Sequence, residues 1–164
     1  MESMTISIRP ICPADQPRML EILTDTTVNK TYMLPDFARL EDAIPLFNRL
    51  QTLSQDPNRF VRAIVAGDRV VGFLNDVETT DSFIELGYVI HPDSHGRGYM
   101  TAALRIAIRE LFEKGHIQVI CGAFEHNIAS MRVMQKAGMV RLEKTDEIEY
   151  RGKVHRCIYY GITK

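Results

Sequence analysis

The chain has little cysteine and no apolar run long enough to cross a bilayer. Its three cysteines, Cys12, Cys121 and Cys157, lie far apart and form no CxxC pair. They therefore predict buried, reduced thiols and neither a disulfide framework nor a metal site. A membrane span needs about 20 consecutive apolar residues, and the opening MESMTISIRP does not have the pattern of a signal peptide. These absences exclude membrane and disulfide-framed proteins and favour a cytoplasmic location.

Neither sign of charge is in excess. The 164 residues include 20 Lys and Arg against 21 Asp and Glu, a formal net charge of -1, which argues against phosphate-neutralising binding of nucleic acid. Hydrophobic residues make up 45% of the chain, and a domain of this length buries about 70% of the surface that it exposes when unfolded. We therefore expect one globular domain over residues 1–164, with no nucleic-acid or membrane partner.

The first third of the chain carries one strand signal and two helix signals. Residues 5–9 alternate in polarity, as a short strand does, and a helix follows from Pro13. Residues 25–36 have loop composition. Residues 40–55 keep a helical stripe that contains Pro45, which fits only if the regular helix begins nearer residue 44.

In the middle of the chain the spacing of apolar residues changes from the helical period to that of strands, and it later returns to the helical period. Alternation and turn residues predict six further strands and two further helices. The strands are expected at residues 60–65, 70–76, 83–90, 117–121, 139–149 and 154–162. The first three form the middle of the chain, and the last two flank Arg151-Gly152. The helices are expected at about residues 100–112 and 127–137. Gly138 follows the last helix, where a left-handed residue is favoured. The order β-α-α-β-β-β-α-β-α-β-β indicates one mixed α/β domain without repeats.

The segment most typical of a binding site is residues 95–101, HGRGYMT, between a strand and a long helix. Two glycines allow the backbone to curl, and the helix start offers unpaired N–H groups to a phosphate or pyrophosphate. The segment is not a P-loop, because no Gly-Lys-Ser/Thr follows, and not a dinucleotide loop, because Thr101 stands at the third glycine position. By itself it is equally a tight turn that starts a helix.

Residues on both sides of this loop extend the pattern. Residues 85–92 read ELGYVIHP, residues 127–130 read NIAS and residues 136–139 read KAGM. Together with the element order they resemble the GNAT superfamily of N-acetyltransferases, and within it the ribosomal-protein-alanine N-acetyltransferase branch. The acetyl-CoA loop of that superfamily has the pattern Gln/Arg-x-x-Gly-x-Gly/Ala. Here His95 stands at the first position, Gly98 at the fixed glycine and Met100 at the last.

The resemblance implies an α/β (α+β) fold with one mixed, mostly antiparallel central sheet and helices on both faces. Two strands would splay apart, and the pantetheine arm of acetyl-CoA would lie between them and pair with the main chain of Val89 and Ile90. Asn127 would contact this arm while it caps its own helix, although a cap needs no ligand. Arg97 would contact a phosphate or stay a solvated loop residue. The cofactor-binding residues expected on this basis are Tyr88, Val89, Ile90, His95, Gly96, Arg97, Gly98, Tyr99, Met100, Thr101, Asn127 and Ser130.

Acetyl transfer to an amine needs a base for the amine and a donor for the departing thiolate. Glu85 lies in an otherwise apolar strand and is the expected base; the alternative is a glutamate on the solvent face of that strand. Many superfamily members place a donor tyrosine where this chain has Met134, which cannot donate. The ribosomal-protein branch instead has the serine that corresponds to Ser130. The alternative for Ser130 is a hydrogen bond back to its own helix.

The expected function is the direct, acetyl-CoA-dependent acetylation of a primary amine. The acceptor is a protein N-terminal α-amine or a small amine such as a polyamine, an amino acid or an aminoglycoside. A non-catalytic acyl-CoA-binding regulatory module and an unrelated nucleotide-phosphate binder are the alternatives. No metal site is expected, because His91 and His95 lie in a loop without a third ligand. In the superfamily the first two helices with their loop, here about residues 24–58, and the last hairpin shape the acceptor site. Homodimers that form through the last strands are also common in it.

The balanced net charge is unevenly distributed. Between residues 75 and 96 the chain carries five acidic residues and no basic one, and three arginines follow. The acidic set is Asp76, Glu78, Asp81, Glu85 and Asp93, and the basic set is Arg97, Arg105 and Arg109. This order predicts an acidic approach for a cationic amine beside a basic site for phosphate.

Overall fold

One short strand and two helices form the first third of the protein. The computed structural model describes residues 5–164. The elements of this part are β1 (Ile6–Arg9), a 3₁₀ turn (Pro13–Asp15), α1 (Gln16–Leu23), two more 3₁₀ turns (Val28–Lys30 and Leu40–Ala43) and α2 (Ile44–Gln55). Pro45 therefore lies in the first turn of α2, where its missing N–H costs no helical hydrogen bond.

The remaining two thirds contain six strands and two helices among the described residues. They are β2 (Val61–Ala66), β3 (Arg69–Thr79), β4 (Ile84–Ile90), α3 (Tyr99–Glu113), β5 (Gln118–Phe124), α4 (Ile128–Lys136), β6 (Val140–Tyr150) and β7 (Lys153–Thr163). Gly138 follows α4 with a φ of 93°, as its position after the helix predicted. No helix in the described part of the chain is long and apolar enough to span a membrane.

The strands form one seven-stranded sheet in the order β1-β2-β3-β4-β5-β7-β6. Every neighbouring pair is antiparallel except β4 and β5, which are parallel. The connection between these two parallel strands is α3, as parallel pairing requires a crossover. The prediction of a mixed, mostly antiparallel sheet is therefore confirmed.

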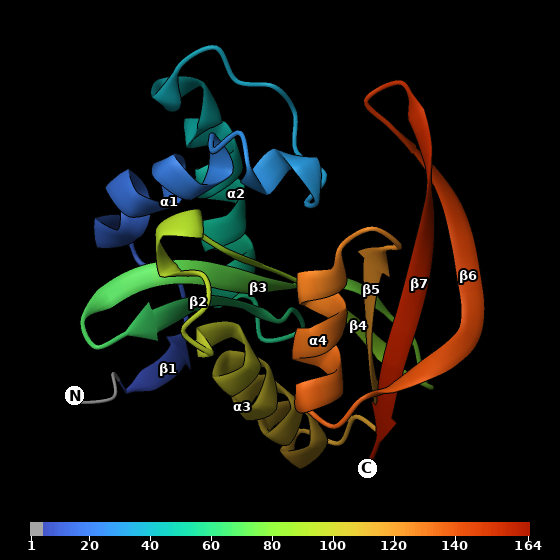
Figure 1. Ribbon diagram of the computed structural model, residues 1–164. Helices are drawn as coiled ribbons and strands as arrows, with labels where there is room; N and C mark the ends of the chain where they lie inside the picture. The colour runs from blue at the N-terminus through green and yellow to red at the C-terminus, as the bar shows by residue number, and fades with distance from the viewer. Residues whose placement is uncertain (1–4) are drawn as a thin grey trace.

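Helices cover both faces of the sheet, and each face has its own core (Figure 1). One core packs α3 and α4 against β4 and β5 through side chains such as Leu86, Leu104 and Met134. The other packs α1 and α2 against β2 and β3 through side chains such as Phe47 and Phe73. Because side chains alternate along a strand, β4 contributes Leu86 to the first core and Val89 to the second.

Three boundaries differ from the sequence-based expectations. The helix predicted from Pro13 begins as a 3₁₀ turn, and the predicted loop 25–36 contains another at Val28–Lys30. The strand predicted to end at Cys121 continues to Phe124, because β5 pairs with β7 along its whole length, up to the Phe124–Cys157 pair. Long-range pairing of this kind overrides local propensity.

Candidate active site

The two parallel strands separate part of the way along their length. β4 pairs with β5 only at Ile84, Glu85 and Leu86, so its last four residues pair with β3 on one side and have no strand on the other. A cleft of about 580 Å³ opens at this point. It is lined by Thr27, Val28, Lys30, Thr31, Tyr32, Gly87, Tyr88, Val89, Ile90, Ser94, His95, Gly96, Gly98, Tyr99, Met100, Thr101, Gly122, Ala123, Asn127, Ala129, Ser130, Arg132, Val133 and Lys136. Eleven of the twelve residues expected to bind the cofactor are among them, and only Arg97 is not.

The loop before α3 presents main-chain N–H groups to one end of this cleft. Gly96 and Gly98 have φ values of 73° and 75°, a left-handed conformation that other residues rarely adopt, and a Cβ at either position would meet nothing within 4 Å. Ala102 is the first residue of the helix whose N–H finds a main-chain acceptor, the Gly98 carbonyl at 3.1 Å. The preceding amides face open space at a helix N-terminus, which suits an anion such as pyrophosphate.

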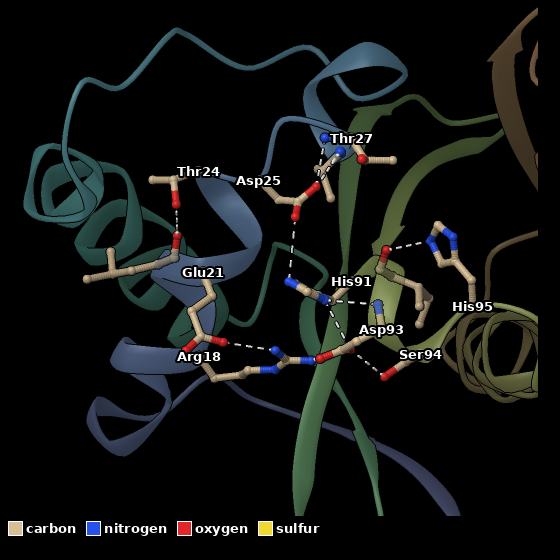
Figure 2. Close-up of polar contacts among 12 residues, drawn as sticks. Arg18, Glu21, Thr24, Asp25, Thr27, His91, Asp93, Ser94 and His95 are labelled. Atoms are coloured by element: carbon tan, nitrogen blue, oxygen red, sulfur yellow. Dashed lines mark hydrogen bonds and ion pairs between the residues drawn. The ribbon is translucent and has the colours of Figure 1, made fainter.

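Polar contacts fix this loop to the end of β4 (Figure 2). The His95 ring lies with Nε2 at 2.9 Å from the Ile90 carbonyl oxygen, and His91 Nδ1 accepts from the Asp93 N–H at 3.1 Å. Arg18 of α1 donates to Asp93 at 2.8 Å, and this contact lowers the pKa of Asp93 far below its usual range. The loop is therefore held by contacts from its own segment and from α1.

The positive charge at the cleft comes from residues that the sequence did not single out. Lys30, Arg132 and Lys136 line it, whereas Arg97 does not. Arg105, another of the arginines predicted to meet phosphate, instead donates to the Lys136 carbonyl at 2.6 Å. Arg105 therefore makes a contact within the protein, and a contact of Arg97 with phosphate stays a prediction.

The predicted acidic approach is also largely neutralised. Asp76 is buried and accepts two hydrogen bonds from Arg59, at 2.8 and 3.0 Å. Asp93 is paired with Arg18 and with Arg69. Two of the five acids of that stretch thus pair with arginines of the fold, and an acidic approach formed by the other three stays a prediction.

Asn127 and Ser130 begin α4 on the other side of the cleft. The Asn127 side chain accepts from the Ser130 N–H at 3.2 Å, so it is the N-cap of the helix. The Ser130 hydroxyl does not bond back to its own helix. Its Oγ lies 2.6 Å from the hydroxyl oxygen of Tyr88, which reaches across from β4. Met134, one turn further on, is fully buried and offers no donor.

Glu85 lies on the opposite face of β4 from Tyr88. It is half-buried and does not line the cleft, but Gly87, two residues along the same face, does. Burial raises the pKa of Glu85; Lys144 opposes this shift, and the carboxylates of Glu78 and Asp146 add to it. A carboxylate with a raised pKa beside a cleft is a better proton acceptor than a solvated glutamate. Glu85 is half-buried, as a residue on the solvent face of a half-covered strand also is, so its role as the base stays a prediction.

The far end of the cleft is closed by the loop after α1. Tyr32 of this loop donates to Asn75 Oδ1 of β3 at 2.7 Å. Tyr150, at the tip of the β6–β7 hairpin, donates to the Asn29 carbonyl at 2.6 Å and accepts from the Leu34 N–H at 3.2 Å. The two contacts of Tyr150 join segments more than 100 residues apart, so the last hairpin holds the loop in place over the cleft.

Sequence reasoning gave the loop residues 27–32 only as part of the segment 24–58, and it missed Gly122 and the role of the cationic side chains in the cleft. Gly122 carried a signal, because it interrupts an apolar strand: a Cβ there would lie 2.8 Å from the Tyr159 ring. The loop residues carried no signal, since nothing in their types distinguishes them from other polar loop residues.

Comparisons with known proteins agree with this geometry. A family model described as an acetyltransferase (GNAT) domain matches residues 5–140. A GNAT-family acetyltransferase from Bacillus anthracis superposes with a TM-score of 0.83 at 22% identity, covering 99% of this chain and 97% of the other. The Salmonella typhimurium enzyme that modifies the N-terminal serine of ribosomal protein L7/L12 gives 0.82 at 16% identity, with 99% and 96% covered. Spermidine N-acetyltransferase from Vibrio cholerae, in complex with CoA and spermine, gives 0.80 at 12% identity, with 96% and 95% covered. At these identities the structural likeness establishes the fold.

Proposed function

Since the chain belongs to the acetyltransferase (GNAT) family, we propose that it transfers an acetyl group from acetyl-CoA directly to a primary amine. The observation that carries the proposal is the position of the cleft. It opens where β4 and β5 separate, with the free amides of the 96–101 loop at one end and the face of β4 that carries Glu85 at the other. One cleft thus joins an anion site to the part of β4 that directly follows the candidate base.

The residues at the anion end fit the chemistry of coenzyme A. The glycine conformations at 96 and 98 leave room for phosphate oxygens against the main chain, and Arg132 and Lys136 of α4 supply positive charge in the cleft. The open edge of β4 after Leu86 offers main-chain groups of Val89 and Ile90 to the amides of the pantetheine arm, as a strand edge does to an added strand. Acetyl-CoA, when bound, supplies the acetyl thioester.

Glu85 and Ser130 are the residues that we propose for proton handling. Glu85 would accept the proton of the amine through a water molecule, because Glu85 does not line the cleft whereas Gly87, on the same face of β4, does. Ser130 lines the cleft from α4 and would donate a hydrogen bond to the thiolate as it departs. A main-chain N–H near Ile90 would stabilise the carbonyl oxygen.

The acceptor is proposed as a protein N-terminal α-amine or a small primary amine. Structural neighbours include proteins described as modifying a ribosomal-protein N-terminus and as acetylating spermidine. The free thiols Cys12, Cys121 and Cys157 support a reducing, cytoplasmic setting for this reaction.

The test is the release of free CoA from acetyl-CoA across a panel of amines. The panel contains short peptides with free N-termini, spermidine, free amino acids and an aminoglycoside, and the melting temperature is measured in parallel with and without CoA. We expect CoA to raise the melting temperature and at least one amine to be acetylated. Stabilisation by CoA without turnover would favour a non-catalytic acyl-CoA-binding module, and no stabilisation by CoA or acetyl-CoA would contradict the proposal.

A further inference from the structure

Tyr88 connects the two sides of the cleft. Its side chain leaves β4 on the face that packs against α3 and α4. Its hydroxyl oxygen lies 2.6 Å from Ser130 Oγ and 3.2 Å from the Ser130 carbonyl oxygen at the start of α4. Both residues line the cleft at the point where β4 and β5 have separated.

The environment of Tyr88 determines what its hydroxyl can do. Burial raises the pKa of Tyr88 well above its usual range, so the phenol keeps its proton at every pH of interest. A phenol of this kind is a permanent hydrogen-bond donor and a poor source of protons. Its single proton has two acceptors within reach, the Ser130 carbonyl oxygen at 3.2 Å and Ser130 Oγ at 2.6 Å, and Oγ is the nearer of the two.

Two contacts hold Ser130, one through its main-chain N–H and one through its hydroxyl. Its N–H is fixed by the Asn127 cap at 3.2 Å, which sets the main chain of the first turn. The cap leaves the side chain free to rotate, and a lone serine hydroxyl would sample three rotamers. The contact with Tyr88 selects one of them.

We propose that Tyr88 is a positioning residue for the acetyl transfer, resting on the function proposed above: it donates to Ser130 Oγ and thereby turns the Ser130 proton into the cleft. A hydroxyl that accepts one hydrogen bond is also a stronger donor in the next, because chained hydrogen bonds polarise one another. Ser130 then points its O–H at the sulfur that carries the developing negative charge.

The reaction balances without net change in either residue. The amine nitrogen attacks the thioester carbon, the C–N bond forms and the C–S bond breaks. The proton lost by the amine passes to Glu85 and on to solvent. The thiolate, stabilised by the hydrogen bond from Ser130, takes a proton from solvent and leaves as the free thiol of CoA.

The test is a double-mutant cycle between Tyr88→Phe and Ser130→Ala, measured as kcat with an amine that the wild-type protein acetylates. Tyr88→Phe keeps the ring and removes only the hydroxyl, so we expect about a 10-fold lower kcat, equivalent to about 1.4 kcal/mol, with the Kd for CoA unchanged. In the Ser130→Ala background the same substitution should change kcat less than 2-fold, since contacting residues that act together are not additive. Ser130→Thr retains a hydroxyl and should restore the sensitivity to Tyr88→Phe.

Tyr160 provides the matched control. It is a buried tyrosine of β7 that also bridges the sheet to α4, where its hydroxyl accepts from Gln135 Nε2 at 3.2 Å, but it does not line the cleft. Tyr160→Phe should cost similar thermal stability and leave kcat within 2-fold. Equal effects of Tyr88→Phe in both Ser130 backgrounds, or a parallel loss of CoA affinity, would overturn the positioning role alone. Absence of turnover by the wild-type protein would overturn the proposed function and this role with it.

Discussion

The two ends of the cleft are built in different ways. The end proposed for the cofactor consists of main-chain groups placed by local features: the left-handed glycines at 96 and 98, the start of α3 and the Asn127 cap. The end proposed for the acceptor is enclosed by side chains from distant segments, such as Tyr150 of the last hairpin on the Asn29 carbonyl, 121 residues away.

This difference indicates which amino-acid substitutions each end of the cleft tolerates. A site made of main-chain amides depends on backbone conformation and is indifferent to most side chains. A site held by side-chain contacts between loops can change its shape through a few substitutions while the sheet stays the same. We therefore expect mutations to separate into two groups, one that changes only the parameters for acetyl-CoA and one that changes only those for the amine.

The largest effect is expected for Glu85→Gln, which removes the proposed base. Loss of the proposed base should lower kcat by about 10²- to 10⁴-fold. Because the side chain does not line the cleft, the Kd for CoA should stay within 2-fold. Steady-state kinetics from pH 5 to 9, with calorimetry of CoA binding, measure both quantities.

The pH profile of the wild-type protein provides a further check on Glu85. Its raised pKa means that the ascending limb due to this carboxylate lies above the range of a free glutamate, and the Gln variant should lack that limb. Glu78, opposite Glu85 in the β3–β4 ladder, is the matched control: Glu78→Gln should keep the wild-type plateau of kcat. A plateau that is unchanged in Glu85→Gln would remove Glu85 as the base.

The second effect in size is expected at Gly98. Its φ of 75° costs a residue with a Cβ about 1–2 kcal/mol, so Gly98→Ala should relax the loop and raise the KM for acetyl-CoA by roughly 5- to 30-fold. The KM for the amine should stay constant. Gly115, beyond the other end of α3 with a φ of 101° and equally open surroundings, is the control. If Gly115→Ala raises the KM for acetyl-CoA to the same extent, general backbone strain, and not a change at the anion site, explains the weaker binding of acetyl-CoA.

The same contrast explains how much could be predicted from the sequence. Gly98, Asn127 and Gly138 each act within a few residues of their own position, and all three local predictions agree with the observed backbone. The element order and the sheet type followed from periodicity in the same way. The cofactor end was therefore largely predictable.

The acceptor end was not, because its contacts depend on the folded chain. Nothing near Ser130 in the sequence indicates that its hydroxyl meets Tyr88, 42 residues earlier. Asp76 and Asp93 looked like free acids until the fold paired them with Arg59 and Arg18. Side-chain pairing at long range is set by tertiary structure, which residue types alone do not encode.

A smaller effect is expected for Tyr150→Phe, which tests the enclosure of the acceptor end. The variant loses the hydrogen bond to the Asn29 carbonyl and those from Leu34 N–H and Arg151 Nε. At about 1 kcal/mol for such a bond, we expect the free energy of unfolding to fall by about 1–2 kcal/mol and the KM for the amine to rise roughly 5-fold. The KM for acetyl-CoA is the internal control. A rise of both KM values together would show that the two ends of the cleft are coupled, and it would contradict their separation into an acetyl-CoA end and an amine end.

The smallest effect is that of Glu85→Gln on the free energy of unfolding. The substitution should raise stability at neutral pH, although it lowers kcat. The folded state raises the pKa of this carboxyl above its unfolded value, mainly by burial. The stability that the proton confers is therefore present below the unfolded pKa and is lost as the pH rises through the folded pKa. Glu85→Gln removes this loss, so the variant should melt at a higher temperature than the wild type at pH 7.5, and the difference should shrink towards pH 4. Thermal unfolding at both pH values measures it. A variant that is less stable at pH 7.5 would mean that the ionised carboxylate stabilises the fold, in which case Glu85 would be a structural ion-pair partner of Lys144 and not a base held ready at a destabilising site.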